Sequence, residues 1–258
     1  MGDNKDHNCD SPEQLLENTK ENIAKFGLQV IMVEATPYLP SFAYSIGLWQ
    51  TYQCPEIICF GLSSKLGHII INDVAELIKK GQLPQAGSTF ADIFKNNDAQ
   101  FLNVHPLSIG DYFGVAIRYY GNEDFPALQL IWTDRNNKFP WEDGFEEEFI
   151  YKQPLLDRNF EFKFREPKNL TTFSTRQWMD ENNPILRVIH DSDGDWQFLT
   201  GDQALIEDAC IIALEQLVIR DKTLNEVFDL EYGEQAEREY IGGKWTRSKV
   251  TEEEEEEI

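Results

Sequence analysis

The fold is decided in residues 42–60, FAYSIGLWQTYQCPEIICF, where two apolar runs flank a short turn. Phe42–Trp49 places apolar side chains at every second position, which is typical of a half-buried β-strand. Glu56–Phe60 forms the second run, and Gln53–Pro55 supplies the turn between the two. A third strand-like run, Leu28–Glu34, precedes them. The three runs predict an antiparallel meander.

Helix signals surround this meander. Ser11 and Pro12 can open a helix that ends at Gly27, because serine caps a helix and proline fits its first turn. Ser63 or Ser64 begins a second helix, and Gly81 ends it. Further signals are two strands within 88–104, a helix over 109–120 and a strand over 127–132.

The C-terminal third carries a separate pattern. Ile185–His190 and Trp196–Thr200 flank the turn Asp191-Ser192-Asp193-Gly194-Asp195, which indicates a β-hairpin because glycine tolerates positive φ. The sequence therefore predicts an α+β fold with mostly antiparallel sheets, flanking helices and two domains, over residues 11–156 and 169–250.

Both ends of the chain are strongly polar. Residues 1–10 are expected to be a disordered lead, and residues 251–258, which include six consecutive glutamates, an acidic disordered tail. The lead has no apolar segment of a secretory signal, and no apolar run in the chain approaches the ~18 residues that span a bilayer. These features predict a cytoplasmic protein.

The net charge restricts the partners. The 258 residues carry 46 Asp and Glu against 23 Lys and Arg, a formal charge of -23. Without the six tail glutamates the charge is still -23 + 6 = -17, so the acidity belongs to the domains themselves. Nucleic acid and anionic membrane surfaces both need a basic face. A basic protein is therefore the partner that the charge favours.

Motifs that carry chemistry are missing. His190-Asp191-Ser192-Asp193-Gly194-Asp195 resembles the start of a calcium loop, but its glycine comes too early and position twelve is Asp202 instead of glutamate. No nucleophile elbow, phosphate loop, CxxC or paired histidine is present. The sequence thus predicts no catalytic residue, no cofactor and no metal site.

Two acidic and aromatic segments are the predicted binding residues. The first contains Trp141, Glu142 and Asp143, and the second contains Asp193, Asp195 and Trp196. Tryptophan is enriched in the cores of protein interfaces, and charge of one sign speeds encounter with a partner of the other sign.

An alternative is a small-ligand or enzyme pocket in the N-terminal domain. The aromatic residues of Phe42–Trp49 are compatible with a buried strand face or with the wall of a flat-ligand site. Shifted pKa values in a deep pocket would favour the second interpretation. Its residues are Tyr44, Glu56, His105, Asp111, Arg118 and Tyr120.

Two resemblances add to these interpretations. Residues 27–156 resemble the bacterial domain of unknown function 4262 family, with Ser45 where threonine is expected. The resemblance rests on Phe42–Leu48, Pro55–Ile58, Phe60–Leu62, Ala127–Leu130, Phe139–Trp141 and Gln153–Leu156. This resemblance implies no particular reaction. A second pattern consists of Pro184–Leu186, Asp193–Phe198, Gly201, Leu230, Gly233, Ala236, Arg238 and Trp245. In this pattern residues 172–247 resemble an immunity-protein domain of bacterial polymorphic toxin systems, which implies binding of a toxin without catalysis.

Taken together, these observations predict a bacterial cytoplasmic protein that is not an enzyme and binds another protein in an immunity-like or regulatory role. The alternative remains a small-ligand-binding protein or an enzyme.

Overall fold

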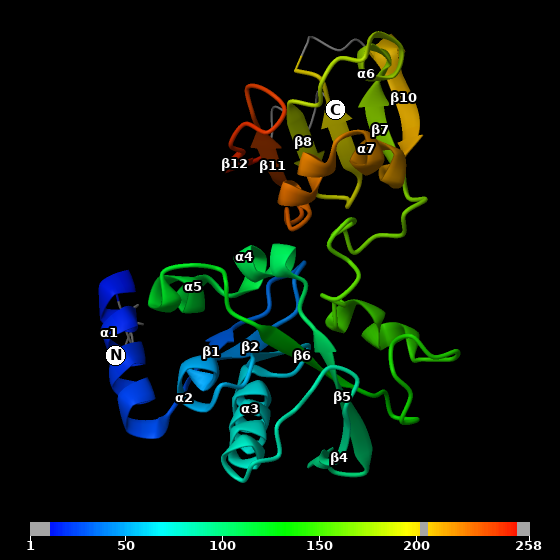
Figure 1. Ribbon diagram of the computed structural model, residues 1–258. Coiled ribbons are helices and arrows are strands. Elements are labelled where there is room, and N and C mark those ends of the chain that lie inside the picture. The colour runs from blue at the N-terminus through cyan, green and yellow to red at the C-terminus, as the bar shows by residue number, and fades with distance from the viewer. Residues whose placement is uncertain (1–10, 202–205, 252–258) are drawn as a thin grey trace, which may run out of the picture. The chain divides into compact units, whose positions relative to one another are not determined.

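The computed structural model describes residues 11–201 and 206–251, which form two compact units (Figure 1). The first unit runs to Phe160 except for Thr36–Leu39, and the second contains Thr36–Leu39 and continues from Glu161. The predicted lead, and all of the predicted tail except Thr251, lie outside the described residues.

A six-stranded sheet organises the first unit. Its order is β1-β2-β3-β6-β5-β4, and the predicted antiparallel meander β1-β2-β3 is confirmed. The pairing of β3 with β6 is parallel, whereas the other neighbours are antiparallel. The strands are β1 (Gln29–Val33), β2 (Phe42–Ile46), β3 (Glu56–Phe60), β4 (Thr89–Phe94), β5 (Asn97–Asn103) and β6 (Ala127–Trp132).

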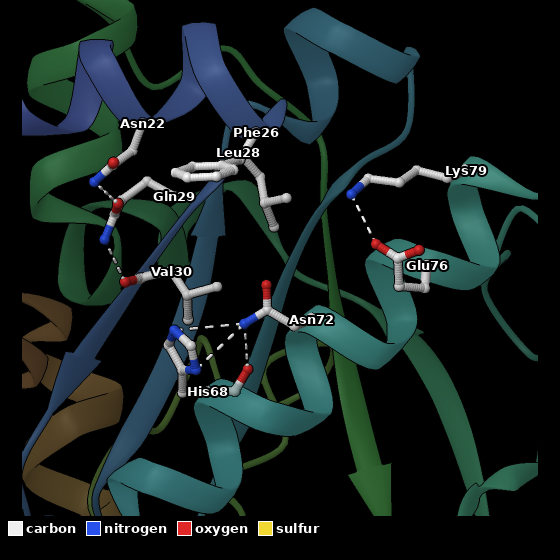
Figure 2. Close-up of a pocket in the computed structure, with 9 residues that line it drawn as sticks. All are labelled: Asn22, Phe26, Leu28, Gln29, Val30, His68, Asn72, Glu76 and Lys79. Atoms are coloured by element: carbon white, nitrogen blue, oxygen red, sulfur yellow. Dashed lines mark hydrogen bonds and ion pairs between the residues drawn. The ribbon is translucent and has the colours of Figure 1, made fainter.

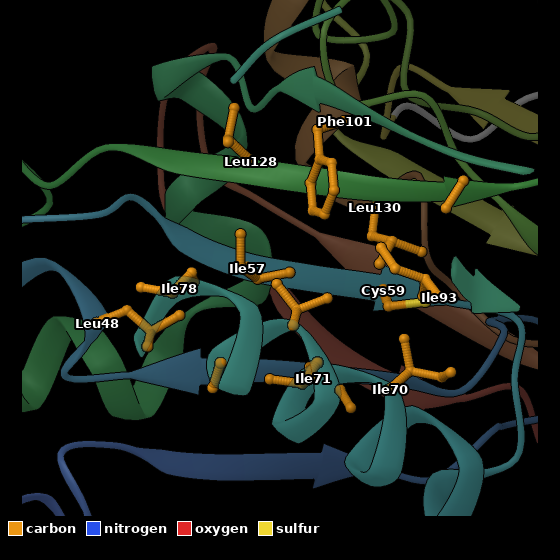
Figure 3. Close-up of a cluster of buried hydrophobic side chains, with 14 of the residues drawn as sticks. Leu48, Ile57, Cys59, Ile70, Ile71, Ile78, Ile93, Phe101, Leu128 and Leu130 are labelled. Atoms are coloured by element: carbon orange, nitrogen blue, oxygen red, sulfur yellow. The ribbon is translucent and has the colours of Figure 1, made fainter. Parts of the chain in front are cut away.

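Helices cover both faces of this sheet. The long helix α3 packs on one face over β1, β2 and β3, and α1 and α5 contribute to the apolar cluster on the other face. Figure 3 shows the cluster beneath α3, which includes Ile57, Ile71 and Phe101. The helical segments of this unit are α1 (Pro12–Phe26), α2 (Leu48–Tyr52), α3 (Ser64–Lys79), η1 (Pro106–Ser108), α4 (Ile109–Tyr112), α5 (Gly114–Tyr120) and η2 (Glu147–Lys152).

Two predicted elements are shorter than their sequence patterns. The strand expected to reach Trp49 ends at Ile46, because Gly47 has a φ of 105° and begins the short helix α2. A Cβ at Gly47 would lie 3.0 Å from Ile23 side-chain atoms, so glycine is required there. The helix expected over 109–120 is divided at Phe113, whose ψ of 33° separates α4 from α5.

The segment after η2 is attached to β6 by two buried glutamines. Gln153 accepts from the Trp132 N–H at 3.0 Å and donates to the Trp132 carbonyl at 2.9 Å. Gln129 donates to the Pro154 carbonyl at 2.7 Å and accepts from the Leu156 N–H at 2.9 Å. Gln153 therefore supplies partners for the backbone groups of Trp132, and Gln129 does so for those of Pro154 and Leu156, where a neighbouring strand would otherwise supply them.

The second unit also contains a six-stranded sheet, in the order β10-β7-β9-β8-β11-β12. The predicted hairpin is confirmed as the antiparallel pair β8 and β9, and β7 with β9 is the only parallel pair among the described strands of this unit. The strands are β7 (Thr171–Thr175), β8 (Arg187–His190), β9 (Trp196–Leu199), β10 (Ala209–Ala213), β11 (Glu234–Glu237) and β12 (Thr246–Lys249). The helical segments are α6 (Arg176–Glu181), η3 (Ile206–Asp208), α7 (Leu214–Arg220) and η4 (Lys222–Val227).

The apolar run within residues 208–217 forms both a strand and the start of a helix. Its first half pairs with β7 as β10, and its second half forms the start of α7. Residues 233–240 are rich in charge and show no apolar alternation, yet they contain β11 between β8 and β12. Both sheets are mixed and mostly antiparallel, which confirms the α+β fold class.

A buried ion pair joins the later elements of the second unit. The Arg238 guanidinium contacts the Asp221 carboxylate, and their side chains are 0% and 7% exposed. Arg238 also donates from Nε and Nη2 to the Ile185 carbonyl at 3.0 and 2.8 Å. Its guanidinium lies 4.3 Å from the Trp245 ring centre. This one side chain therefore connects the approach to β8, the start of η4 and the segment before β12.

Candidate functional site

The predicted binding residues at Trp141 belong to an ordered loop, residues 134–149, which we call the Trp141 loop. Its base is Asp134, which is 1% exposed and accepts from the backbone N–H groups of Asn136, Lys138 and Glu146 at 2.8, 2.9 and 3.1 Å. Desolvation opposes ionisation of Asp134, but these three donors prevail and lower its pKa. One carboxylate thus fixes both ends of the loop.

The tip of the Trp141 loop presents an aromatic ring that is followed in sequence by two carboxylates and has the Arg158 guanidinium 5.4 Å from its centre. Trp141 is 39% exposed and stacks on Phe139 with ring centres 5.0 Å apart and an interplanar angle of 5°. The Glu142 carboxylate accepts from the Phe139 N–H at 2.6 Å, and both Glu142 and Asp143 are exposed. The indole is therefore held in place before any partner arrives.

Cations in and near the Trp141 loop reduce its negative charge only in part. Arg135 bonds to Glu146 at 2.8 Å and also contacts Glu148. The Lys138 ammonium donates to the Asp143 carbonyl, which leaves the Asp143 carboxylate unused by that contact. The loop contains six carboxylates against two cations, so its formal charge is 2 - 6 = -4.

The second predicted binding segment is the hairpin turn between β8 and β9. Asp191 organises this turn by accepting from the N–H groups of Asp193 at 3.1 Å and Asp195 at 2.9 Å. Gly194 has a φ of 94°, as the turn requires. Asp193 and Asp195 are exposed, whereas Trp196 is 0% exposed.

Trp196 lies in an aromatic cluster in the core of the second unit. Its ring stacks on the buried imidazole of His190 with ring centres 4.0 Å apart. Tyr38 and Tyr232 pack edge-on against that imidazole, with ring centres 5.0 and 4.7 Å from its centre. The Tyr38 hydroxyl bonds to Glu166 at 2.6 Å. Trp196 is thus a packing residue, and the carboxylates of the turn are the groups that reach solvent.

The alternative pocket residues meet only in part. Glu56 is 0% exposed and accepts from the Ser45 hydroxyl at 2.5 Å, the Tyr120 hydroxyl at 2.5 Å, and the N–H groups of Gly47 and Trp49 at 2.9 and 3.1 Å. Burial raises the pKa of Glu56, although these four donors act to lower it. Burial beside Glu56 also raises the pKa of Tyr120.

The other four alternative residues differ in burial and in their neighbours. Tyr44 is buried, with a pKa raised by desolvation to about 12, and its hydroxyl accepts from the Val115 N–H. His105 stacks on Phe160 at 3.6 Å. Asp111 and Arg118 are exposed.

The structure forms a cavity that the sequence did not indicate, where the end of α1 and the edge strand β1 face α3. Its volume is about 480 Å³ (Figure 2). Its lining residues are Asn22, Phe26, Leu28, Gln29, Val30, His68, Asn72, Glu76 and Lys79. None of the six alternative pocket residues lines this cavity, or the cavities beside Cys54 and Ile219. The residue types alone carried no signal, since the lining comes from three separate elements.

Residues 11–201 and 206–251 show neither a metal-binding cluster nor a membrane-spanning helix. That part of the chain holds no group of three or more His, Cys, Asp or Glu side chains arranged to bind a metal ion. It also contains no helix that is both long and apolar enough to cross a bilayer.

Comparison with known families identifies the N-terminal domain. Residues 22–146 match the family described as "Domain of unknown function (DUF4262)". This match supports the resemblance that the motifs of the N-terminal domain predicted. No curated protein and no solved structure matches the chain. The resemblance of residues 172–247 to an immunity-protein domain stays a prediction. The Trp141 loop up to Glu146 and the whole lining of the α1–β1–α3 cavity lie inside the matched range.

Proposed function

We propose that this is a bacterial cytoplasmic protein-binding module, immunity-like or regulatory and not an enzyme, which docks a basic protein on the Trp141 loop. The observation that carries this proposal is the position of Trp141. Its ring is 39% exposed and stacked on Phe139, the Arg158 guanidinium lies 5.4 Å from its centre, and the exposed Glu142 and Asp143 follow it in the loop.

The fixed conformation of the Trp141 loop supports binding through Trp141. A side chain that is already immobile loses little conformational entropy when a partner covers it, so more of the contact energy becomes affinity. The hydrogen bonds of Asp134 and Glu142 hold the loop in one geometry without a ligand. Burial of a tryptophan anchor at an interface commonly contributes about 2 kcal/mol or more.

The charge supports a basic partner. The loop carries a formal charge of -4 within a chain of -23, so a cationic surface would be attracted from a distance and oriented toward Trp141. Asp193 and Asp195 form a second exposed acidic turn in the other unit. We propose that this turn adds to the attraction, since Trp196 is not accessible as an anchor.

The surroundings of Glu56 support a role other than catalysis. A general acid or base needs an oxygen that can reach a substrate proton. The Glu56 oxygens already accept four donors, and its side chain is fully buried. We propose that Glu56 stabilises the turn at Gly47.

The test uses the immobilised full chain to capture proteins from bacterial lysate over a series of salt concentrations. Trp141→Ala is compared with Tyr240→Ala, a control that removes another exposed aromatic side chain (63% exposed) far along the sequence. We expect a basic protein that the Tyr240 variant retains, and whose affinity Trp141→Ala lowers by roughly 30-fold, the equivalent of about 2 kcal/mol.

Titration of the purified partner by calorimetry then gives the dissociation constant at each salt concentration. Affinity that falls with added salt is expected for a charge-steered complex. A captured protein that is acidic, or that binds the Trp141 variant as tightly as the unmodified chain, would contradict the proposal.

A further inference from the structure

The α1–β1–α3 cavity has a polar lining whose orientation the backbone fixes. Asn72 donates from Nδ2 to the His68 carbonyl at 2.8 Å. A carbonyl only accepts hydrogen bonds, so the amide nitrogen must face it and the amide oxygen must face away. No donor among the described residues reaches the Asn72 oxygen, and Figure 2 shows it turned away from His68.

The side-chain amides of Gln29 and Asn22 form a second hydrogen-bonded network, and the backbone fixes their orientation in the same way. Gln29 donates from Nε2 to the Val30 carbonyl at 2.7 Å, which leaves the Gln29 oxygen to accept from Asn22 Nδ2 at 2.7 Å. The side-chain oxygen of Asn22 is then the last acceptor of this network, and no donor among the described residues bonds to it. Two independent amide networks that line one cavity therefore both end in an acceptor.

A carboxylate adds charge to these acceptors. Glu76 contacts the Lys79 ammonium at 2.8 Å through one oxygen, and the two side chains are 58% and 34% exposed. An exposed pair of this kind contributes little to stability, so a ligand can compete for the carboxylate. The cavity consequently offers hydrogen-bond acceptors and one carboxylate, which a ligand would share with Lys79 or take from it.

The remaining wall is apolar and already attracts a cation. Leu28 and Val30 are buried at the base, and the Phe26 ring is 53% exposed. The Lys25 ammonium lies 4.8 Å from the centre of that ring. The electron-rich face of an aromatic ring favours flat cations, which also shed their hydration shell more easily than an ammonium does.

We propose that the α1–β1–α3 cavity binds a guanidinium group. A guanidinium is planar, always charged, and carries five N–H donors and no acceptor, which complements the oxygens of Asn22, Asn72 and Glu76. A volume of about 480 Å³ accommodates this group with its alkyl chain. Acceptor-rich ligands are disfavoured, because they would meet the unpaired oxygens of Asn22 and Asn72.

This site is independent of the proposed docking of a basic protein on the Trp141 loop. Loss of guanidinium binding would leave that docking intact, and the reverse also holds. The guanidinium could belong to a free small molecule or to an arginine side chain in a peptide, and the two sources share the chemistry that the cavity recognises.

The test is calorimetric titration of the full chain with N-butylguanidinium, with neutral N-butylurea as the shape-matched control ligand. We expect saturable binding of the guanidinium and at least tenfold weaker binding of the urea, because only the first has a charge to pair with Glu76. A capped Gly-Arg-Gly peptide is the third ligand. Tighter binding of the peptide assigns the site to arginine side chains, and tighter binding of N-butylguanidinium assigns it to a free ligand.

Variants locate the binding. Glu76→Gln is expected to weaken N-butylguanidinium about tenfold, since a charge-assisted hydrogen bond becomes a neutral one. Asp73→Asn removes the same charge from the same helix outside the cavity lining and should leave the affinity unchanged. Asn72→Leu removes a fixed acceptor and should weaken binding as well. Equal affinities for the guanidinium and the urea, or an affinity that neither Glu76→Gln nor Asn72→Leu changes, would overturn the proposal.

Discussion

Replacement of Arg238 by methionine should destabilise the second unit by about 3–5 kcal/mol, which is typical when one partner of a buried ion pair is removed. Methionine fills much of the space of the arginine side chain, so the change isolates the lost polar contacts from a packing defect. Arg238 is 0% exposed, and its partner Asp221 is 7% exposed, so water cannot compensate either group in the folded unit.

The magnitude follows from the contacts that the variant loses. The Ile185 carbonyl loses donors at 3.0 and 2.8 Å, and the Thr223 hydroxyl loses one at 2.5 Å. Asp221 keeps only the Thr223 N–H at 3.0 Å and the Thr223 hydroxyl, and it remains charged in a desolvated position. An unpaired buried charge costs more than a missing neutral hydrogen bond, which places the expected loss near the upper part of this range.

Hydrogen exchange over residues 209–230 in a urea series measures this loss, because the segment lies between the contacts of Arg238. The control is the double variant Arg238→Met with Asp221→Leu, which removes both charges together. Buried pairs replaced by apolar residues are often tolerated, so the double variant should be about 2 kcal/mol more stable than the sum of the single changes predicts. A single-variant cost below about 1 kcal/mol, or strictly additive effects, would refute the reasoning.

Three further predictions concern single side chains. Glu56→Gln should lower the free energy of unfolding, measured in urea, by about 2–4 kcal/mol, because an amide oxygen cannot accept all four donors. Tyr120→Phe removes one donor and should lower it less, so equal effects of the two variants would contradict this. Burial lowers the pKa of His190, so the unfolded chain takes up the proton first, and stability should fall as the pH drops below roughly 6.5. His190→Phe should flatten that slope in urea titrations between pH 7 and 5, and an unchanged slope would assign it to other groups. The pKa of Asp134 is lowered, so the Trp141 loop keeps its order above the ordinary aspartate pKa and loses it as the pH falls through the lowered value. Asp134→Asn should speed amide exchange in the loop already at neutral pH, and unchanged exchange would mean that the carboxylate does not hold the loop.

Elements with local signals were predicted well. Ser11 caps α1 through a bond from the Gln14 N–H at 3.2 Å, and Gly27 ends the helix with a φ of 87°. The Asp-Gly turn formed the expected hairpin. In each case the determining contacts lie within a few residues of one another, so the sequence around the element contains the information.

Elements that depend on distant partners were not predictable in the same way. The strand pattern through Trp49 was interrupted at Gly47, where the carboxylate of Glu56 and the side chain of Ile23 impose the turn. The segment containing β11 has no apolar alternation, but it pairs with β8 and β12 on both sides. Backbone pairing across the sheet outweighs local propensity in such a strand.

The candidate sites also combine features that the local sequence sets with features that depend on distant partners. The sequence by itself determined the acidic charge, the caps, the hairpin and the residues of the Trp141 loop, since these depend on composition and on neighbours along the chain. Only the tertiary structure decided that Trp141 is exposed while Trp196 is buried. It alone also brought Asn22, Gln29 and Asn72 to one cavity. The exposure of a side chain, and the meeting of several side chains at one cavity, depend on which elements pack together. That packing joins residues far apart in sequence.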